Sequence, residues 1–351
     1  MKKIALFLVT VIFITGCKKD EEASDEAHIL DFSVVNTSIT GFSLEQVFID
    51  EKFSHVLVLS QNNLSDENPP ISFIPEIEIS PGATIFPNSG DEVSFYNKDE
   101  AISYVVTAEN GDQVTWSFTI RDMQLPNAGF EDWYDTVGMN GGHYLEPGLS
   151  ARSTVWSTAN MGTSIYGEYG TQPITDGENT LVQITTGETS SVPVTSGTIF
   201  TGKFDIQGAI NNPTDPSQAT DFGIPFTFRP VALKLNYKFT PGEHYVDGTL
   251  VDPNDIFGGF TIDTLEGSDQ CYLWSFLEII NGDDVQVVAK AELVQGDTVK
   301  ELTEVIIPYV YESDLKPTHI SVVLSSSKDG GEFRGAVGST LIVDDVELVY
   351  E

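Results

Sequence analysis

The sequence predicts an all-β protein made of two β-sandwiches in tandem, a smaller one followed by a larger one. Strand-like runs rich in Val, Ile, Thr, Phe and Tyr recur throughout the 351 residues, and Gly, Pro, Asn and Asp separate them at short intervals. No segment has the length and the 3.6-residue periodicity of a long helix. A hydrophobic content of 40% suffices for a sizeable core, and a chain of this length favours two domains.

The first residues have the pattern of an export signal. Two lysines precede the apolar run at residues 4–14, which is too short to span a bilayer because a spanning helix needs about 20 apolar residues. The motif ITGC, which ends at Cys17, resembles the lipobox of bacterial lipoproteins. This resemblance implies that residues 1–16 are a signal peptide and that Cys17 is lipidated. The alternative is an ordinary secretory signal with an incidental cysteine.

Residues 17–27 are polar and acidic, which predicts a flexible tether. Lysine followed by acidic residues just after Cys17 resembles the surface-export signal of Bacteroidota lipoproteins. The two resemblances imply a protein that is lipid-anchored in the outer membrane and faces the cell exterior. Two or three acyl chains would anchor it stably, whereas a single chain anchors only marginally.

Residues 28–122 predict the smaller sandwich. Short alternating runs follow one another, and Asn110-Gly111 between two of them is typical of a type I′ hairpin turn, which needs positive φ angles. This pattern fits an Ig-like β-sandwich. The segment also resembles the Ig-like modules at the front of many Bacteroidota surface lipoproteins, which usually act as spacers. We assign it no chemistry.

Residues 123–351 predict the larger sandwich. Its strand-like runs are joined by loops of very different lengths, which favours a jelly roll with elaborated loops. Alternation between residues 285 and 293 places the odd-numbered side chains inward and Lys290 and Glu292 outward. Trp274 and Cys271 lie in an apolar run, and we expect both side chains in the core.

The charge balance excludes several classes of partner. With 17 basic and 53 acidic residues the formal net charge is −36, which repels phosphate backbones and makes nucleic-acid binding improbable. It also disfavours strongly anionic polysaccharides, unless a local basic pocket overrides the bulk charge. An acidic surface is equally a means of keeping an exported protein soluble.

The sequence offers no signature of an organic cofactor or of a Cys/His metal cluster. If Cys17 is lipidated, Cys271 is the only remaining thiol, so no intramolecular disulfide can form. The five histidines show no metal-ligand spacing, and neither a G-x-S-x-G motif nor a P-loop occurs. His143 is the one histidine in a candidate pocket loop, where a solvated imidazole is the simpler interpretation.

A carboxylate in the last strand requires a partner. Strict alternation places Asp344 on the same face as Ile342 and Val346, hence among inward apolar residues. A buried carboxylate is costly unless it is paired. Arg121 is the nearest candidate cation, and a bound Ca²⁺ ion is the other solution, because calcium takes six to eight oxygen ligands.

The two ends of the larger domain resemble the opening and closing strands of jelly-roll carbohydrate-binding modules. The motif N-x-GFE at residues 127–131 and the motif VDDVEL at residues 343–348 carry this resemblance. In those modules the two strands are neighbours and often ligate a structural calcium, which implies Glu131 and Asp344 as ligands with a nearby main-chain carbonyl. The alternatives are that Asp344 and Asp345 hydrogen-bond turn amides, or that the carboxylates are catalytic.

A wider resemblance covers the whole larger domain. Residues 197–205, 222–242 and 325–350 together resemble the Bacteroidota lipoprotein domain called the putative carbohydrate metabolism domain. Members of that family are described as putative glycoside hydrolases. The resemblance implies a role in carbohydrate acquisition or metabolism, and it transfers no catalytic residue.

Glycan recognition requires aromatic rings that stack on the apolar faces of sugars and planar polar groups that bind hydroxyls. The loop-rich segment 133–169 supplies both. The stacking candidates are Trp133, Tyr144, Trp156 and Tyr166. Arg229 is the candidate for a hydroxyl pair. The alternatives are that the two tryptophans are core anchors and that Arg229 neutralises neighbouring acids.

We therefore predict a surface lipoprotein that binds a poly- or oligosaccharide through its jelly-roll domain without cleaving it. The alternatives are a glycoside hydrolase and an adhesin or structural surface protein. Hydrolysis needs two carboxylates roughly 5 to 10 Å apart, and with 53 acidic residues the sequence nominates no pair. Exposed aromatics that form a platform would favour binding. Neither the glycan nor any partner in a glycan-uptake complex is identified by the sequence.

Overall fold

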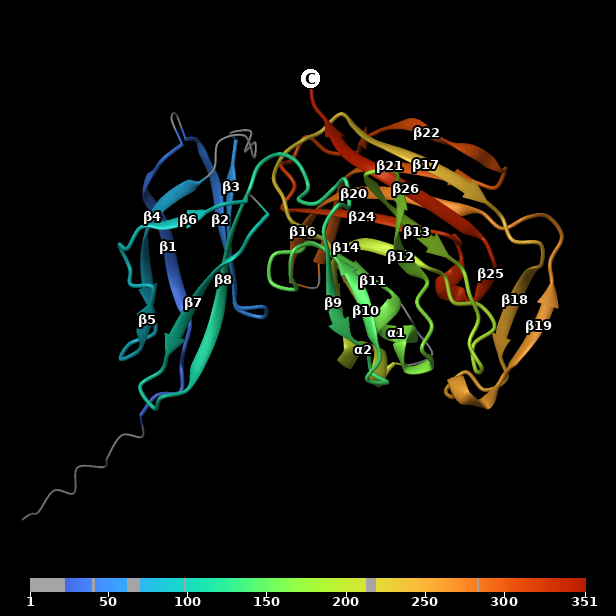
Figure 1. The fold of residues 1–351 in the computed structure, drawn as a ribbon, viewed down its shortest axis with the longest axis horizontal. Coiled ribbons are helices and arrows are strands. Elements are labelled where there is room, and N and C mark those ends of the chain that lie inside the picture. The colour runs from blue at the N-terminus through green and yellow to red at the C-terminus, as the bar shows by residue number, and fades with distance from the viewer. Residues whose placement is uncertain (1–22, 40–41, 62–69, 98, 213–218, 283) are drawn as a thin grey trace, which may run out of the picture.

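The computed structural model describes residues 23–39, 42–61, 70–97, 99–212, 219–282 and 284–351. Within them β-strands dominate, which confirms the all-β prediction (Figure 1). The predicted signal peptide at residues 1–16, Cys17 and the first part of the tether lie outside the described residues. No helix in the described part of the chain is long and apolar enough to cross a membrane.

The smaller sandwich consists of two sheets around their own core. The three-stranded sheet has the order β1 (Ile29–Thr37), β4 (Ile71–Ile79), β6 (Val93–Phe95). The five-stranded sheet has the order β2 (Leu44–Asp50), β3 (His55–Ser60), β8 (Gln113–Arg121), β7 (Ile102–Thr107), β5 (Thr84–Phe86). Buried aromatic side chains fill the space between them, and Phe73 and Phe95 both contact Phe118 edge-on.

The predicted hairpin at Asn110-Gly111 joins β7 to β8. Ala108 N donates to Asp112 O at 2.8 Å, and Gly111 alone within this turn has a positive φ, of 96°. A type I′ turn requires positive φ at both central residues, so the hairpin prediction is confirmed and the turn type was wrong.

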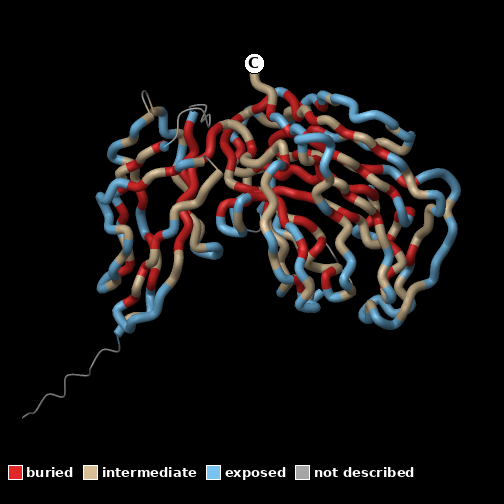
Figure 2. The backbone as a smooth tube through the Cα atoms, in the orientation of Figure 1, coloured by how far each residue is buried: buried red, intermediate tan, exposed pale blue. Residues whose placement is uncertain are grey.

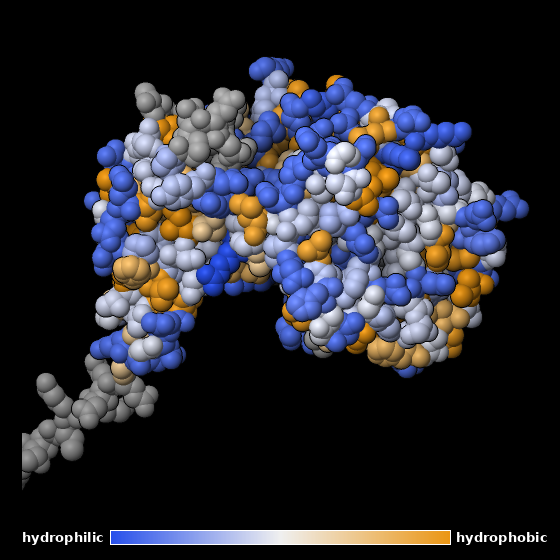
Figure 3. Space-filling view, in the orientation of Figure 1, coloured by the Kyte–Doolittle hydropathy of each residue, from blue (hydrophilic) through white to orange (hydrophobic). Residues whose placement is uncertain are grey.

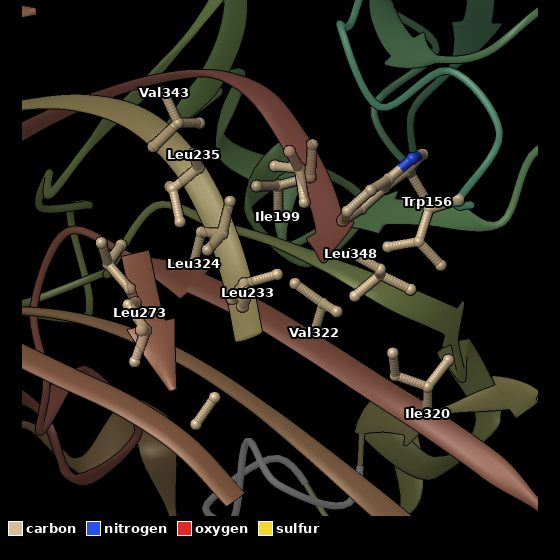
Figure 4. Packing of buried hydrophobic residues seen from close by; sticks show 14 of the residues in the cluster. Trp156, Ile199, Leu233, Leu235, Leu273, Ile320, Val322, Leu324, Val343 and Leu348 are labelled. Atoms are coloured by element: carbon tan, nitrogen blue, oxygen red, sulfur yellow. The ribbon is translucent and has the colours of Figure 1, made fainter. Parts of the chain in front are cut away.

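The larger sandwich has two facing sheets. The eight-stranded sheet has the order β11 (Trp156–Thr158), β14 (Thr198–Phe204), β24 (His319–Ser325), β20 (Cys271–Asn281), β21 (Asp284–Gln295), β23 (Val310–Tyr311), with β15 (Thr220–Phe222) paired to β14 and β16 (Ile224–Pro225) paired to β24. The five-stranded sheet has the order β12 (Thr171–Asp176), β13 (Asn179–Thr185), β26 (Thr340–Val349), β17 (Ala232–Thr240), β22 (Val299–Pro308). Leu273 and Val322 from the first sheet meet Leu233 and Val343 from the second in one core (Figure 4).

Smaller elements extend this sandwich. They are the hairpin of β9 (Trp133–Val137) and β10 (His143–Pro147), the three-stranded sheet β19 (Phe260–Thr264), β18 (Tyr245–Leu250), β25 (Arg334–Ala336), and the short helices α1 (Asn160–Thr163), η1 (Ser164–Tyr166), α2 (Ile206–Asn211), η3 (Ile256–Gly258) and η4 (Gly330–Glu332). The hairpin, β11, α1 and η1 all lie within the predicted loop-rich segment, so part of that segment is regular structure.

A β-bulge in β21 changes which side chains face the core. Leu277 pairs with Ala289, but Glu278 pairs with Val287, so Val288 is an extra residue in the ladder. Ala289 therefore faces the core as predicted, whereas Val285 is 57% exposed. The inward prediction for Val285 was wrong because alternation assumes an unbroken ladder.

The strand β3 is shared between the two cores. Val56 and Val58 belong to the core of the smaller sandwich, while Leu57 and Leu59 belong to the core of the larger one. All four side chains are at most 1% exposed. Figure 2 shows buried segments inside each sandwich and along the strands where the two meet. The two sandwiches are thus packed against each other through apolar side chains.

The segment between the sandwiches is also held in place. Gln124 Nε2 donates to Leu348 O at 2.8 Å, and Leu348 N donates to Gln124 Oε1 at 2.9 Å. Tyr350 Oη donates to Met123 O at 2.6 Å. An ion pair between Glu45 and Lys316 links the sandwiches directly. The connection is therefore docked along β26.

We predict that Leu57→Ala destabilises both sandwiches. The substitution leaves a cavity in the core of the larger sandwich although the residue belongs to a strand of the smaller one, so it should lower the free energy of unfolding by about 2–5 kcal/mol. Urea unfolding followed by tryptophan fluorescence measures the change. Val285→Ala, at a side chain that is 57% exposed, is the control. A loss for Leu57→Ala no larger than that of the control would contradict the shared core.

Candidate functional site

The segment around Glu131 lies beside β26, as the carbohydrate-binding-module resemblance implied. Val346 N donates to Ala128 O at 2.9 Å, which joins the two chain segments. The Asn127 side chain closes the loop, since Asp132 N donates to its Oδ1 and its Nδ2 donates to Asp132 O, both at 3.0 Å. Thr180 N donates to Glu131 Oε1 at 3.4 Å. The segment that opens the larger domain therefore lies beside its last strand. It is not a paired strand, however, because residues 127–131 form a turn and loop and the first strand, β9, pairs with β10.

Asp344 is only 1% exposed, but it does not face the core. Lys234 pairs with Glu347 and Asn236 pairs with Asp344, so β26 holds one extra residue, and Asp345 has a φ of 50°. This β-bulge ends the alternation that began in the first half of the strand. The prediction that Asp344 points inward among apolar residues was wrong for this reason.

Two hydrogen bonds satisfy the Asp344 carboxylate. Asn179 Nδ2 donates to its Oδ2 at 2.7 Å, and Asp345 N donates to its Oδ1 at 2.8 Å. Burial raises the pKa of Asp344, the Asn179 hydrogen bond opposes this, and the neighbouring carboxylates of Asp345 and Glu131 raise the pKa further. No ion pair joins Arg121 to Asp344 in the described part of the chain. The alternative in which the Asp344 carboxylate accepts a hydrogen bond from a backbone amide at the bend of the strand therefore applies to Asp344.

The residues around Glu131 and Asp344 offer few ligands for calcium. Among the described residues, no three His, Cys, Asp or Glu side chains converge as a metal site. The carboxylates of Glu131 and Asp344, with the carbonyls of residues 127–130, are the oxygens that could hold the ion. The calcium site stays a prediction.

The two tryptophans predicted to stack on sugars both donate hydrogen bonds to backbone carbonyls. Trp156 is 1% exposed, its Nε1 donates to Pro126 O at 2.8 Å, and its ring lies 5.1 Å from that of Phe130. Figure 4 shows Trp156 among core side chains. A sugar therefore has no access to Trp156, which is the core anchor of the alternative interpretation. Trp133 is partly buried, and its Nε1 donates to Phe130 O at 2.8 Å.

The predicted loop residues do not form one platform. Tyr144 is 7% exposed and stacks on Tyr169, with ring centroids 5.1 Å apart and an interplanar angle of 15°. Tyr166 ends η1 and is partly exposed. His143 is exposed, and its Nδ1 lies 2.6 Å from Asp135 Oδ2, which fits a solvated loop histidine. Of the four stacking candidates, Trp133 and Tyr166 keep partly exposed rings.

Arg229 is bound by backbone rather than by acids. Its Nη2 donates to Ser313 O at 3.0 Å, its Nη1 donates to Leu315 O, and the guanidinium lies 4.2 Å from the centroid of the Tyr311 ring. Arg229 makes no ion pair within the described ranges, so neutralisation of neighbouring acids is not its role there. A sugar contact by Arg229 is untested.

Sequence reasoning missed an aromatic row on β20. Cys271, Leu273 and Leu277 face the core, so the residues between them lie on the opposite face of the sheet and are partly exposed. These are Tyr272, Trp274 and Phe276, joined by Phe222 from β15. Trp274 was predicted to be in the core, and this was wrong because β20 is apolar on both faces, so periodicity alone does not say which face is covered.

We call Tyr272, Trp274, Phe276 and Phe222 the aromatic face. Trp274 is 4.6 Å from Phe276, 5.8 Å from Phe222 and 6.3 Å from Tyr272 between ring centroids. Phe222 is 36% exposed. Figure 3 shows that apolar side chains on the drawn side of the molecule occur in separate groups among polar ones. The aromatic face is thus a local cluster of contacting rings.

Polar groups border the aromatic face. Tyr272 Oη donates to a Glu292 carboxylate oxygen, and Lys290 Nζ lies 5.8 Å from the centroid of the Phe276 ring. Glu278 Oε2 accepts a hydrogen bond from Ser321 Oγ at 2.9 Å. Charged donors and acceptors therefore stand next to the rings.

A pocket of about 380 Å³ lies where the two sandwiches meet. Its basic lining residues are Lys52, His55, Arg121, Arg152, Lys203 and His319, and its acidic ones are Asp50 and Asp221. We call it the basic pocket. Phe222 lines the basic pocket and also contacts Trp274, so the pocket and the aromatic face are adjacent.

The basic side chains of the pocket are perturbed by burial. Burial and the nearby Arg121 charge together lower the pKa of Lys203 to about 8, although Glu146 and Asp50 oppose this shift. Burial likewise lowers the pKa of Arg121 to about 10 and that of His55 to about 3. Desolvation is the largest cause of all three shifts.

The pocket shows no pair of free carboxylates for hydrolysis. Asp221 is ion-paired with Lys52 at 2.5 Å. Glu146 lies close enough to Lys203 for their charges to interact, and burial raises the pKa of Glu146 to about 7. Glu146 is only 7% exposed and accepts a hydrogen bond from Thr158 Oγ1 at 2.6 Å, and it is not among the residues that line the pocket.

Comparison with known proteins gives a family and a fold. A family model described as putative carbohydrate metabolism domain matches residues 129–349. A solved structure of a putative glycoside hydrolase from Bacteroides thetaiotaomicron is 24% identical, covers 94% of this chain and 99% of its own, and has a TM-score of 0.56. Another from Bacteroides vulgatus is 23% identical, covers 64% and 97%, and has a TM-score of 0.52. At these identities the likeness is one of fold. The search of curated proteins found no match.

We propose that a structural Ca²⁺ binds at Glu131 and Asp344, where the resemblance places it. Removal of calcium by EDTA should then lower the melting temperature, because the ion offsets the repulsion between the buried Asp344 carboxylate and the exposed Glu131 carboxylate. Glu131→Gln should be less sensitive to EDTA than the wild type, and Glu168→Gln, at an exposed carboxylate elsewhere, should behave as the wild type. An EDTA-independent melting temperature in the wild type would refute the site.

Proposed function

The chain belongs to the putative carbohydrate metabolism domain family, and we propose that it binds a glycan on the aromatic face of its larger sandwich without cleaving it. The observation that carries the proposal is the row of partly exposed rings on one face of β20. Pyranose rings have apolar CH faces that stack on aromatic side chains, and Trp and Tyr combine a large apolar area with a polar end. A cluster of this kind on a rigid sheet suits an extended carbohydrate.

The neighbouring polar groups suit sugar hydroxyls. Binding sites combine apolar walls with a few placed donors and acceptors that fix orientation. Glu292, Lys290 and Glu278 are such groups beside the aromatic face. Each can hydrogen-bond a hydroxyl while a ring covers the CH face of the same sugar, which supports recognition of a poly- or oligosaccharide.

The aromatic face supports binding better than the loop residues do. Its rings contact one another and share one side of a sheet, whereas Trp133, Tyr166 and Arg229 come from separate elements. A glycan site formed by these three residues remains the alternative location within the proposal. Mutation of Trp133 distinguishes between these two candidate binding sites.

We predict that Trp274→Ala weakens glycan binding by about tenfold or more, since loss of one stacked aromatic side chain costs about 1–3 kcal/mol in comparable binding sites. A panel of plant, host-mucin and microbial glycans identifies a ligand, and calorimetry with that ligand measures the affinity. Trp133→Ala should bind normally if the aromatic face is the site.

Other outcomes would redirect the proposal. Release of reducing ends from a bound glycan would favour the glycoside hydrolase. A broad panel without a ligand would favour the adhesin or structural protein. Loss of binding in Trp133→Ala but not in Trp274→Ala would move the site to the loop segment.

We also propose that the protein is an outer-membrane lipoprotein that faces the cell exterior and takes part in carbohydrate acquisition. The ITGC motif that ends at Cys17 and the acidic tether that follows it support this location. In cells fed an alkyne fatty acid, the wild type should be labelled and Cys17→Ser should not. Equal labelling of both proteins, or protection of the wild type from protease added to intact cells, would contradict the anchor or the exposure respectively.

A further inference from the structure

The basic pocket carries a surplus of positive charge in a strongly acidic chain. Of the 17 lysines and arginines in the sequence, Lys52, Arg121, Arg152 and Lys203 line this one pocket, against the two acids Asp50 and Asp221. Asp221 is already paired with the exposed Lys52. The local charge is therefore opposite in sign to that of the protein as a whole, which favours an anionic ligand here.

Arg121 is the least satisfied of these cations. It is 8% exposed, and its Nη1 has no hydrogen-bond partner among the described residues. It forms no ion pair in the parts of the chain that the structure describes, and the one carboxylate that acts on its charge is Asp99, beside it in a small neighbouring pocket. A buried guanidinium is strongly unfavourable unless an anion or several acceptors surround it. Arg121 lines the pocket, so its charge acts on whatever enters it.

Lys203 adds a second cation to the pocket, from the other sandwich. Its Nζ donates to Thr154 O at 3.1 Å and makes no ion pair within the described ranges, although the charges of Glu146 and Asp50 act on it. Lys203 comes from β14 of the larger sandwich, whereas Arg121 ends β8 of the smaller one. Both residues line the basic pocket. An anion between them would be bound from both sandwiches at once.

We propose that the basic pocket binds the carboxylate of a uronic acid residue in the glycan that lies on the aromatic face. The inference rests on the proposed glycan-binding function, because Phe222 joins the pocket to the aromatic face. The planar guanidinium of Arg121 matches a carboxylate with two parallel hydrogen bonds, and Lys203 supplies a point charge beside it. The ligand is thus an acidic oligosaccharide with neutral, stacking units next to the acidic one.

The test compares an acidic trisaccharide with its neutral counterpart on the full chain. Calorimetry with trigalacturonate and with galactotriose should show that the acidic sugar binds about tenfold tighter, the change expected from a charge-assisted hydrogen-bonded pair. Lys203→Met should abolish this preference. The substitution keeps an unbranched side chain and removes a buried charge, so the fold is retained. Lys300→Met, at an exposed lysine outside the pocket, should keep the preference.

Equal affinity for the two trisaccharides would overturn the inference, as would an undiminished preference in both Lys203→Met and Arg121→Gln. A preference for a sulfated galactose trisaccharide over trigalacturonate would overturn the assignment of a carboxylate. Galactotriose binding that depends on Trp274, without any acidic preference, would leave the proposed function standing and remove only this inference. An acidic preference that depends on Lys203 but is unaffected by Trp274→Ala would instead separate the pocket from the aromatic face.

Discussion

The sharing of β3 between two cores is the constraint on which the rest of the structure depends. Because adjacent side chains of a strand point to opposite faces, the run from Val56 to Leu59 fills both cores with consecutive residues. Neither sandwich can shift relative to the other without exposing large apolar side chains. The smaller sandwich is consequently a structural part of the larger one, and this differs from a spacer that merely lifts a functional domain.

Both parts of the candidate site follow from this docking. Arg121 and His55 come from the smaller sandwich and Lys203 from the larger one, so the basic pocket exists only because the two are packed together. The aromatic face lies on a central strand of the larger sandwich, whose other face is buried in the shared core. The docking thus fixes where the pocket lies relative to the rings.

The sequence predicted the fold class, the family and the proximity of residues 127–131 to the last strand of the larger domain, because hydrophobic periodicity and short motifs are local signals. It failed where an inserted residue breaks the pattern, as at Asp344 and Val285, because one bulge reverses the facing of a strand. The prediction for Trp274 was wrong because β20 is apolar on both faces, so its sequence does not indicate which face is buried. The basic pocket could not be predicted from the sequence, because Arg121 and Lys203 come together only when the two domains pack.

The spacing of the rings on β20 sets a length scale for the ligand. Tyr272, Trp274 and Phe276 occupy alternate positions, and each residue of a strand advances the chain by about 3.3 Å, so the first and last of these positions are roughly 13 Å apart. A single sugar unit covers one ring, whereas a linear chain covers them in succession. Units held together by glycosidic bonds dock at high effective concentration once the first is seated. Under the proposed function, such a surface would discriminate by degree of polymerisation and would release the short products of digestion more readily than the polymer.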